Sequence, residues 1–254
     1  MLTGMSRPAY FTLVFALLGG VTVTAQPQVS ASDSSTTFNV FLRSTLIGFE
    51  QTDVTRSATG WTIRSRGHLA QPVDLRTHLA EIEYDEQWQP VSLRIDGLRN
   101  DSPFSLTTSF SDSSATSQIE DNGQSRNVTN TVFQNAVVLP DYFFAGYEAL
   151  AQQLKGSAPG DEIPIYVPPR GQTRARVDQT TSQQIETNSG QAIDVRRYLV
   201  SFLSDNGPRL TEIWTDRDQN LVRISIPDIA IDATRADITS VGARLRTTSH
   251  AGDE

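Results

Sequence analysis

The sequence predicts an all-β protein in which a curved antiparallel sheet, or half-barrel, wraps around one amphipathic α-helix. Three observations carry this prediction. Apolar and polar residues alternate over many short segments, Gly, Asn and Asp residues separate those segments, and a single segment has helical spacing. Alternation with a period of two means that one face of a strand is packed and the other is wet, which is typical of antiparallel sheets.

The first 25 residues have the three parts of a secretory signal peptide. Arg7 closes a short basic region, residues 10–23 are apolar and uncharged, and Val23-Thr24-Ala25 places small residues before a cleavage site near Ala25. The apolar run is short for a membrane span. We therefore expect a periplasmic or secreted protein without a membrane span after cleavage. An uncleaved N-terminal anchor is the alternative. Residues 26–37 are small and polar, and they are predicted to be a disordered leader.

The predicted strands share a clear alternation of apolar and polar residues. The clearest cases are residues 61–69, 91–97, 104–110 and 198–202. Residues that tolerate positive φ lie between the predicted strands, at 58–60, 85–87, 121–123, 188–190, 205–207 and 216–218. This spacing predicts a single antiparallel β domain over residues 38–240, followed by a frayed tail at 241–254.

The predicted helix covers Asp141–Leu154. Phe144, Tyr147, Leu150, Ala151 and Leu154 fall on one helical face, Pro140 and Asp141 precede it, and Gly156 follows it. A single amphipathic helix among antiparallel strands is expected to fill the open side of the curved sheet.

Composition excludes several classes of function. The chain has 254 residues, no cysteine and a net charge of −8 from 29 acidic and 21 basic residues. The absence of cysteine excludes disulfide scaffolds, thiol nucleophiles and Cys-ligated metals, and the acidic balance argues against a nucleic-acid partner. The sequence contains no G-x-S-x-G, Walker or H-E-x-x-H motif. We therefore assign no catalytic residue and no cofactor, and enzymatic activity is not expected.

Two polar pairs were considered for chemistry. His68 and His78 lie in strand-like sequence near carboxylates and could hold a metal ion, whereas Glu81 and Glu83 share one face of a predicted strand and could act as an acid–base pair. The solvent-facing side of a sheet explains both pairs more simply. No metal site is assigned.

The aromatic residues indicate a groove for a ligand. We predict that it is lined by Trp61, Tyr84, Trp88, Tyr142, Phe143, Phe144, Tyr147 and Trp214. An open half-barrel lined by aromatic rings can hold an apolar or sugar ligand. Ordinary core packing is the alternative explanation of the same residues.

Several motifs resemble a known family. They are Ile47-Gly48, Gly60-Trp61, Glu83-Tyr84-Asp85-x-x-Trp88, the stretch Leu139-Pro140-Asp141-Tyr142-Phe143-Phe144, and Glu212-x-Trp214-x-Asp216. This set resembles the N-terminal β-rich domain of exported bacterial α/β-hydrolase proteins. More broadly, it is similar to periplasmic proteins built like the curved sheets of the lipoprotein carriers LolA and LolB. The catalytic domain of those hydrolases has no counterpart before Glu254.

The resulting hypothesis is an exported, non-catalytic binding or accessory module. The predicted aromatic groove indicates an apolar or glycan-like ligand, and the resemblance implies a hydrolase partner. The alternative is the N-terminal part of a secreted esterase-like or peptidase-like α/β-hydrolase whose catalytic domain is missing or separately encoded.

Overall fold

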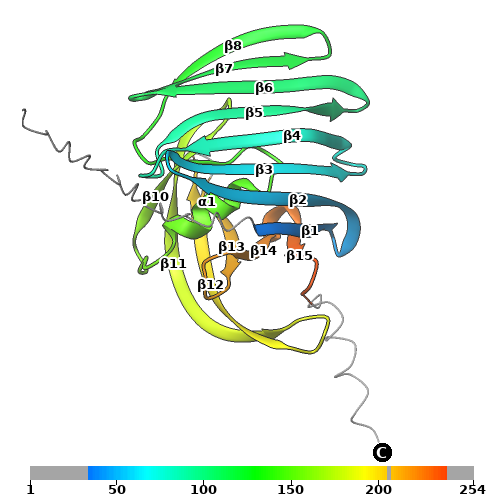
Figure 1. The fold of residues 1–254 in the computed structure, drawn as a ribbon, viewed down its shortest axis with the longest axis vertical. Coiled ribbons are helices and arrows are strands. Elements are labelled where there is room, and N and C mark those ends of the chain that lie inside the picture. The colour runs from blue at the N-terminus through cyan, green and yellow to red at the C-terminus, as the bar shows by residue number, and fades with distance from the viewer. Residues whose placement is uncertain (1–33, 205–206, 239–254) are drawn as a thin grey trace, which may run out of the picture. The chain divides into compact units, whose positions relative to one another are not determined.

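The computed structural model describes residues 34–204 and 207–238. These residues confirm the predicted fold class: a curved, open sheet of 15 strands with a single α-helix among the described residues (Figure 1). The strands are β1 (Ser34–Leu42), β2 (Thr45–Ser57), β3 (Gly60–Leu69), β4 (Leu75–Tyr84), β5 (Pro90–Arg99), β6 (Ser102–Ser111), β7 (Ser114–Asp121), β8 (Gln124–Thr131), β9 (Val137–Val138), β10 (Glu162–Val167), β11 (Gly171–Glu186), β12 (Ala192–Leu203), β13 (Arg209–Thr215), β14 (Leu221–Ile226) and β15 (Ile231–Arg235).

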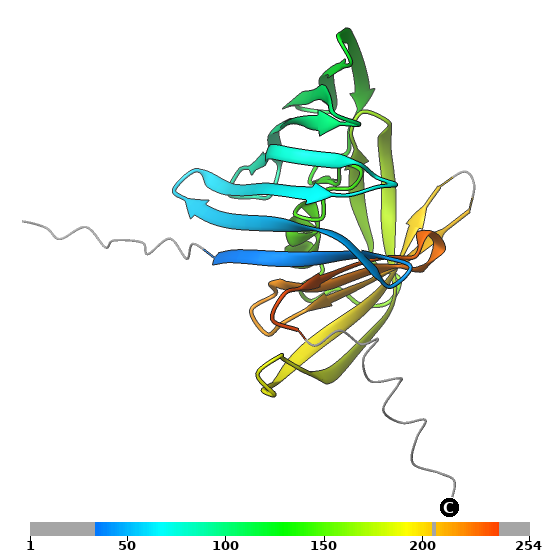
Figure 2. The same cartoon turned by 90° about the vertical axis from the view of Figure 1, so that its right-hand side faces the viewer.

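The order of the strands follows the chain in two runs. β1 to β8 are successive neighbours on one side of the sheet, and β9 to β15 are successive neighbours on the other. The two runs join where β1 pairs with β15, with Phe38 opposite Arg235 and Leu42 opposite Ile231 (Figure 2). All pairs are antiparallel except the short contact of β9 with β10.

Alternation along the strands correctly predicts most buried positions. In β3, Ile63 and Leu69 are buried, whereas Arg64 and Arg66 are exposed. In β5 the expectation is wrong for Val91, which is 47% exposed. A register shift pairs Glu83 with Ser92 but Tyr84 with Pro90, so Val91 is the extra residue of a bulge and turns outward.

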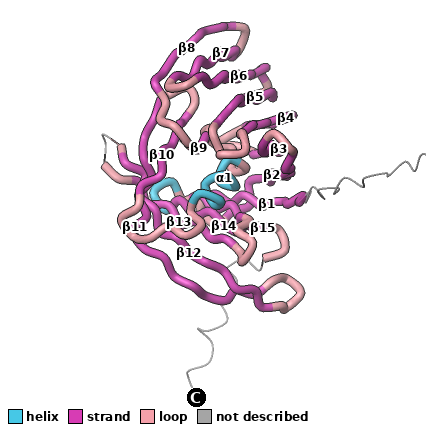
Figure 3. Tube along the Cα trace, turned by 60° about the vertical axis from the view of Figure 1, so that its left-hand side comes forward, coloured by secondary structure: helices cyan, strands magenta, loops and turns pink. Residues whose placement is uncertain are grey.

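The helix α1 (Gly146–Gln153) is shorter than the predicted Asp141–Leu154. Residues 141–145 instead form turns, and Tyr142 has a left-handed φ of 64°. The predicted end is confirmed, since Leu154 is the C-terminal cap and Gly156 follows with φ of 81°. Figure 3 shows α1 inside the curve of the strands.

Two glycines on the sheet allow neighbouring strands to approach closely. Glu50, Gly67, Thr77 and Gly97 form one row across β2 to β5, each the register partner of the next, and therefore share one face. A Cβ atom on Gly97 would lie 2.2 Å from the Arg76 carbonyl oxygen. The strands thus approach more closely at this row than a larger residue would permit.

The boundaries of the predicted domain differ at its N-terminal side. β1 begins at Ser34, four residues inside the segment 26–37 that was expected to be a disordered leader. Its residues pair with β2, with Thr36 opposite Thr52, and this pairing extends the ladder beyond Phe38. The predicted signal peptide at 1–25, the rest of the leader and the predicted tail at 241–254 lie outside the described residues.

Side chains link the two ends of the sheet. Asn130 on β8 donates from Nδ2 to the carbonyl oxygen of Pro169 at 2.8 Å and to the hydroxyl of Tyr166 at 3.3 Å. Ser117 on β7 lies 3.4 Å from the same Tyr166 hydroxyl. These bonds tie β7 and β8 to the β10–β11 hairpin, and the sheet is curved enough for its edges to meet through side chains.

Candidate functional site

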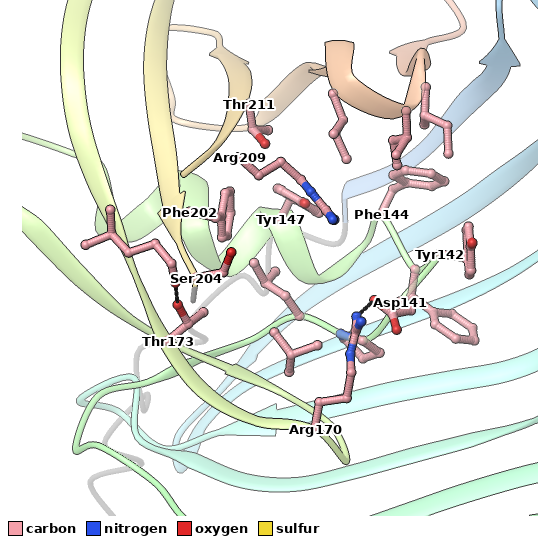
Figure 4. Close-up of a pocket in the computed structure, with 18 of the residues that line it drawn as sticks. Asp141, Tyr142, Phe144, Tyr147, Arg170, Thr173, Phe202, Ser204, Arg209 and Thr211 are labelled. Carbon is pink, nitrogen blue, oxygen red and sulfur yellow. Dashed lines mark hydrogen bonds and ion pairs between the residues drawn. The ribbon is translucent and has the colours of Figure 1, made fainter. Parts of the chain in front are cut away.

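A cavity of about 470 Å³ lies beside the start of α1. Its walls come from the segment before the helix, the β10–β11 turn, the end of β12, the start of β13 and the 3₁₀ turn η1 (Pro227–Ile229). The lining residues are Leu139, Pro140, Asp141, Tyr142, Phe143, Phe144, Tyr147, Val167, Arg170, Gly171, Gln172, Thr173, Phe202, Leu203, Ser204, Arg209, Thr211, Ile226, Ile229 and Ile231 (Figure 4). Its volume falls in the range of about 300–1,000 Å³ that is typical of small-molecule sites.

The turn before α1 supplies the aromatic wall. The Phe143 amide donates to the Pro140 carbonyl oxygen at 3.4 Å, which closes a turn around Asp141 and Tyr142. The left-handed backbone of Tyr142 leaves its ring 47% exposed at the rim, while Phe143 and Phe144 are buried. Because the helix starts only at Gly146, these aromatic residues lie in a turn, and this turn forms the wall.

The opposite wall comes from the second half of the sheet. The ring of Tyr147 packs edge-on against Phe202, with centroids 6.4 Å apart. The Thr173 hydroxyl donates to the Leu203 carbonyl oxygen and holds the end of β12 against β11. Ile229 is 40% exposed at the rim, so exposed apolar groups stand on two sides of the opening.

Among the described residues, the cavity lining has one more positive group than negative groups. Arg170 forms an ion pair with Asp141, and both side chains lie at the cavity (Figure 4). Arg209 also lines the cavity and is exposed, and no carboxylate among the described residues forms an ion pair with it. Burial raises the pKa of Tyr147, and the charge of Asp141 adds to this effect while Arg209 opposes it. Tyr147 therefore keeps its proton at neutral pH.

Two amides in the turn that leads into α1 are not available to a ligand. Glu50 on β2 accepts the Phe144 amide at 2.7 Å and the Ala145 amide at 3.3 Å. Burial raises the pKa of Glu50, and the Ser65 hydroxyl and these two amides act in the opposite direction. The N-terminal end of the helix is thus capped by a side chain from a distant strand.

The structure divides the predicted groove residues among three places. Tyr142, Phe143, Phe144 and Tyr147 line the cavity together. Trp61, Tyr84 and Trp88 form a separate cluster, in which Trp61 stacks on Trp88 at 4.9 Å and Tyr84 lies 5.4 Å from Trp88.

Trp214 lies in a third place. It belongs to a small buried group with Val195, Val222 and Ile238, and its indole N–H donates to Glu212 at 3.4 Å. None of the three tryptophans lines the cavity.

Sequence reasoning missed the charged part of the cavity. Arg170 and Arg209 follow turn sequences at the ends of predicted strands, and no motif marks them. Thr173 and Thr211 also line the cavity, and no sequence motif marks them either. Only the folding of β11 and β13 beside the turn before α1 brings these residues to one place.

The polar pairs considered for chemistry lie on the outer face of the sheet. His68 and His78 are exposed. Glu81 forms an ion pair with Arg64, and Glu83 accepts the Ser92 hydroxyl at 2.8 Å. Within residues 34–204 and 207–238, no three His, Asp or Glu side chains are grouped to share a metal ion. No helix in the same ranges has the length and apolar character that a membrane span requires.

Comparisons with known proteins give a likeness in fold. No protein-family model and no curated protein matches the sequence. A solved structure, the β-barrel-like protein of domain of unknown function DUF1849 from Brucella abortus, is similar with a TM-score of 0.49 and 9% sequence identity. The alignment covers 81% of this chain and 97% of that chain. The link to exported hydrolases and to LolA and LolB stays a prediction from the sequence motifs.

Proposed function

We propose that this protein is a non-catalytic binding module that holds a small, mainly apolar ligand in the cavity beside α1. The observation that carries this proposal is the aromatic cavity of about 470 Å³ with exposed apolar groups, Tyr142 and Ile229, at its rim. Apolar lining with a few convergent polar groups is typical of ligand sites.

The lining offers little for catalysis. Among the described residues, no histidine lines the cavity, and its one acidic residue, Asp141, is paired with Arg170. A general base within hydrogen-bond reach of a nucleophile is what acyl-transfer chemistry needs. The proposal therefore assigns retention of a ligand to the cavity and no chemical step.

The proposal includes export. The predicted signal peptide at 1–25 supports a periplasmic or secreted location, where a ligand carrier or accessory module would act. Fusing residues 1–37 to a reporter that is active only outside the cytoplasm tests this part. Export of the fusion supports it, and retention in the cytoplasm contradicts it.

A neutral fluorescent probe tests the cavity. The three tryptophans lie outside it, so their emission is a poor reporter, and N-phenyl-1-naphthylamine is preferable because it becomes fluorescent in apolar sites. We expect saturable binding of one probe per chain. Val167→Trp should fill the cavity and abolish binding, whereas Val91→Trp on the outer face should leave binding unchanged.

Two outcomes would contradict the proposal. One is the absence of saturable probe binding, and the other is unchanged binding in a Val167→Trp protein whose circular dichroism matches the wild type. Competition with maltoheptaose distinguishes a glycan site from a purely apolar site, because the sugar would displace the probe only from a site that binds glycans.

The hydrolase partner implied by the sequence resemblance is tested separately, by affinity capture with the full chain followed by an esterase assay of the captured material.

A further inference from the structure

We infer that the ligand of this cavity is an anionic amphiphile, whose charged head contacts Arg209 at the rim while its apolar tail occupies the aromatic interior. This inference rests on the proposed function and adds the chemical class of the ligand. It depends on the charges of the lining, on what the helix already binds, and on the polar groups around Arg209.

The lining charges favour a single negative group on the ligand. Among the described residues Asp141 is the only acid of the lining, and Arg170 neutralises it. Arg209 remains as the lining cation without an ion pair among the described residues. A guanidinium forms bidentate bonds to a carboxylate or phosphate that are stronger than bonds between neutral groups.

Two other groups of potential anion donors can be compared with Arg209. The Phe144 and Ala145 amides, in the turn before α1, already donate to Glu50 and are not free to bind an anion. Further exposed arginines without an ion pair in the described residues are Arg43, Arg56, Arg66, Arg76, Arg126 and Arg196, and none of them lines the cavity. Among the described residues, Arg209 both lacks an ion pair and lines the cavity.

Polar groups close to Arg209 complete a head-group site. Thr211 lies two residues further along β13, so its side chain is on the same face of the strand, and it also lines the cavity. Figure 4 shows Arg209 reaching toward Tyr147, whose hydroxyl keeps its proton and can donate. The apolar groups beyond them, including Phe144 and Phe202, would contact the tail.

A set of probes with one tail and different heads tests the inference. Dodecanoate, dodecanol and dodecylamine are titrated calorimetrically against the full mature chain, with acetate as a head without a tail. We expect dodecanoate to bind about tenfold more tightly than dodecanol, and acetate to show no binding, because a charged hydrogen bond adds to burial of the tail.

Three variants assign the effect to Arg209. Arg209→Gln should weaken dodecanoate binding to the level of dodecanol and leave dodecanol unchanged. Arg209→Lys should restore part of the preference, since it restores the charge without the bidentate geometry. Arg196→Gln, an exposed arginine on β12 outside the cavity, should behave like the wild type.

The outcomes separate this inference from the proposed function. If no probe with a tail binds, both are overturned. If dodecanol binds as tightly as dodecanoate, or if Arg209→Gln keeps the preference for dodecanoate, the anionic head is overturned and the apolar cavity stands. Tightest binding of dodecylamine would overturn the inference by showing that Asp141 selects a cationic head.

Discussion

The carboxylate of Glu50 accepts the backbone N–H of Phe144 at 2.7 Å, across 94 residues of sequence. The same carboxylate accepts the Ala145 N–H at 3.3 Å, so one side chain of β2 caps α1 and fixes the turn that lines the cavity. These two hydrogen bonds join β2, in the first half of the sheet, to the turn before α1 that lines the candidate ligand site. Several consequences for stability can be measured.

Glu50→Ala should destabilise the fold strongly. It leaves two buried amides without an acceptor, and each unsatisfied group costs about 1–3 kcal/mol. Glu50→Gln keeps an acceptor and should lose less. Urea denaturation of both variants measures the free energy of unfolding, with Glu81→Ala on the outer face as the control. Equal stability of Glu50→Ala and wild type would contradict the capping role.

Glu148 on α1 should make stability depend on pH. Burial raises its pKa to about 7, with Asp216 adding to the rise, while the Leu221 amide and Arg235 oppose it. The folded state therefore binds this proton more tightly than the unfolded chain. Its contribution is fully present below the unfolded value of 4.5 and is lost as the pH rises through about 7.

Glu148→Gln isolates this effect. Its amide oxygen can still accept the Leu221 N–H, which lies 3.1 Å from the carboxylate in the wild type. Relative to wild type, the variant should gain about 3 kcal/mol of unfolding free energy between about pH 4.5 and pH 8. Denaturation series at several pH values measure this difference. A constant difference across the series would rule out titration of Glu148.

Tyr84→Phe should destabilise the contact between the two halves of the sheet. The Tyr84 hydroxyl accepts the buried Val138 N–H at 3.0 Å, and burial raises the pKa of this hydroxyl well above its usual range. Its loss leaves the Val138 amide unpaired, at a cost of about 1–3 kcal/mol. Tyr142→Phe, at an exposed ring, is the matched control and should stay within about 0.5 kcal/mol of wild type. Thermal unfolding distinguishes the two.

Gly97→Ala should disturb the close approach of β4 and β5. The new Cβ atom would lie 2.2 Å from the Arg76 carbonyl oxygen, so the backbone has to shift, at a cost of about 1–3 kcal/mol. Ser109→Ala on the exposed face of neighbouring β6 provides the comparison. If the two alanine variants unfold at the same urea concentration, a glycine at position 97 is not required for the close approach of β4 and β5.

The local pattern of the sequence was sufficient to predict the fold class and to predict which face of most strands is buried. In β3 the alternation of Ile63 with Arg64 reproduces what the structure buries and exposes, because period two follows directly from the backbone of a strand. It failed at Val91, where a bulge reverses the face, and at the start of α1, which begins five residues after Asp141. The first error comes from the register of the β4–β5 pair and the second involves a contact with Glu50 on distant β2, and local periodicity contains neither.

The aromatic set illustrates the same limit for the site. The sequence marks Trp61, Trp214 and Tyr142 equally, yet the structure places them in three separate surroundings. Which rings share a space depends on how β10 to β15 fold back beside the turn before α1.

By itself, the sequence determined an antiparallel sheet with one helix, because alternation, turn residues and helical spacing are properties of neighbouring residues. Only the tertiary structure decided that Glu50 caps that helix and that Arg209 stands beside the cavity. These relationships join residues far apart in the chain, and they arise from the curvature and register of the sheet rather than from any local motif.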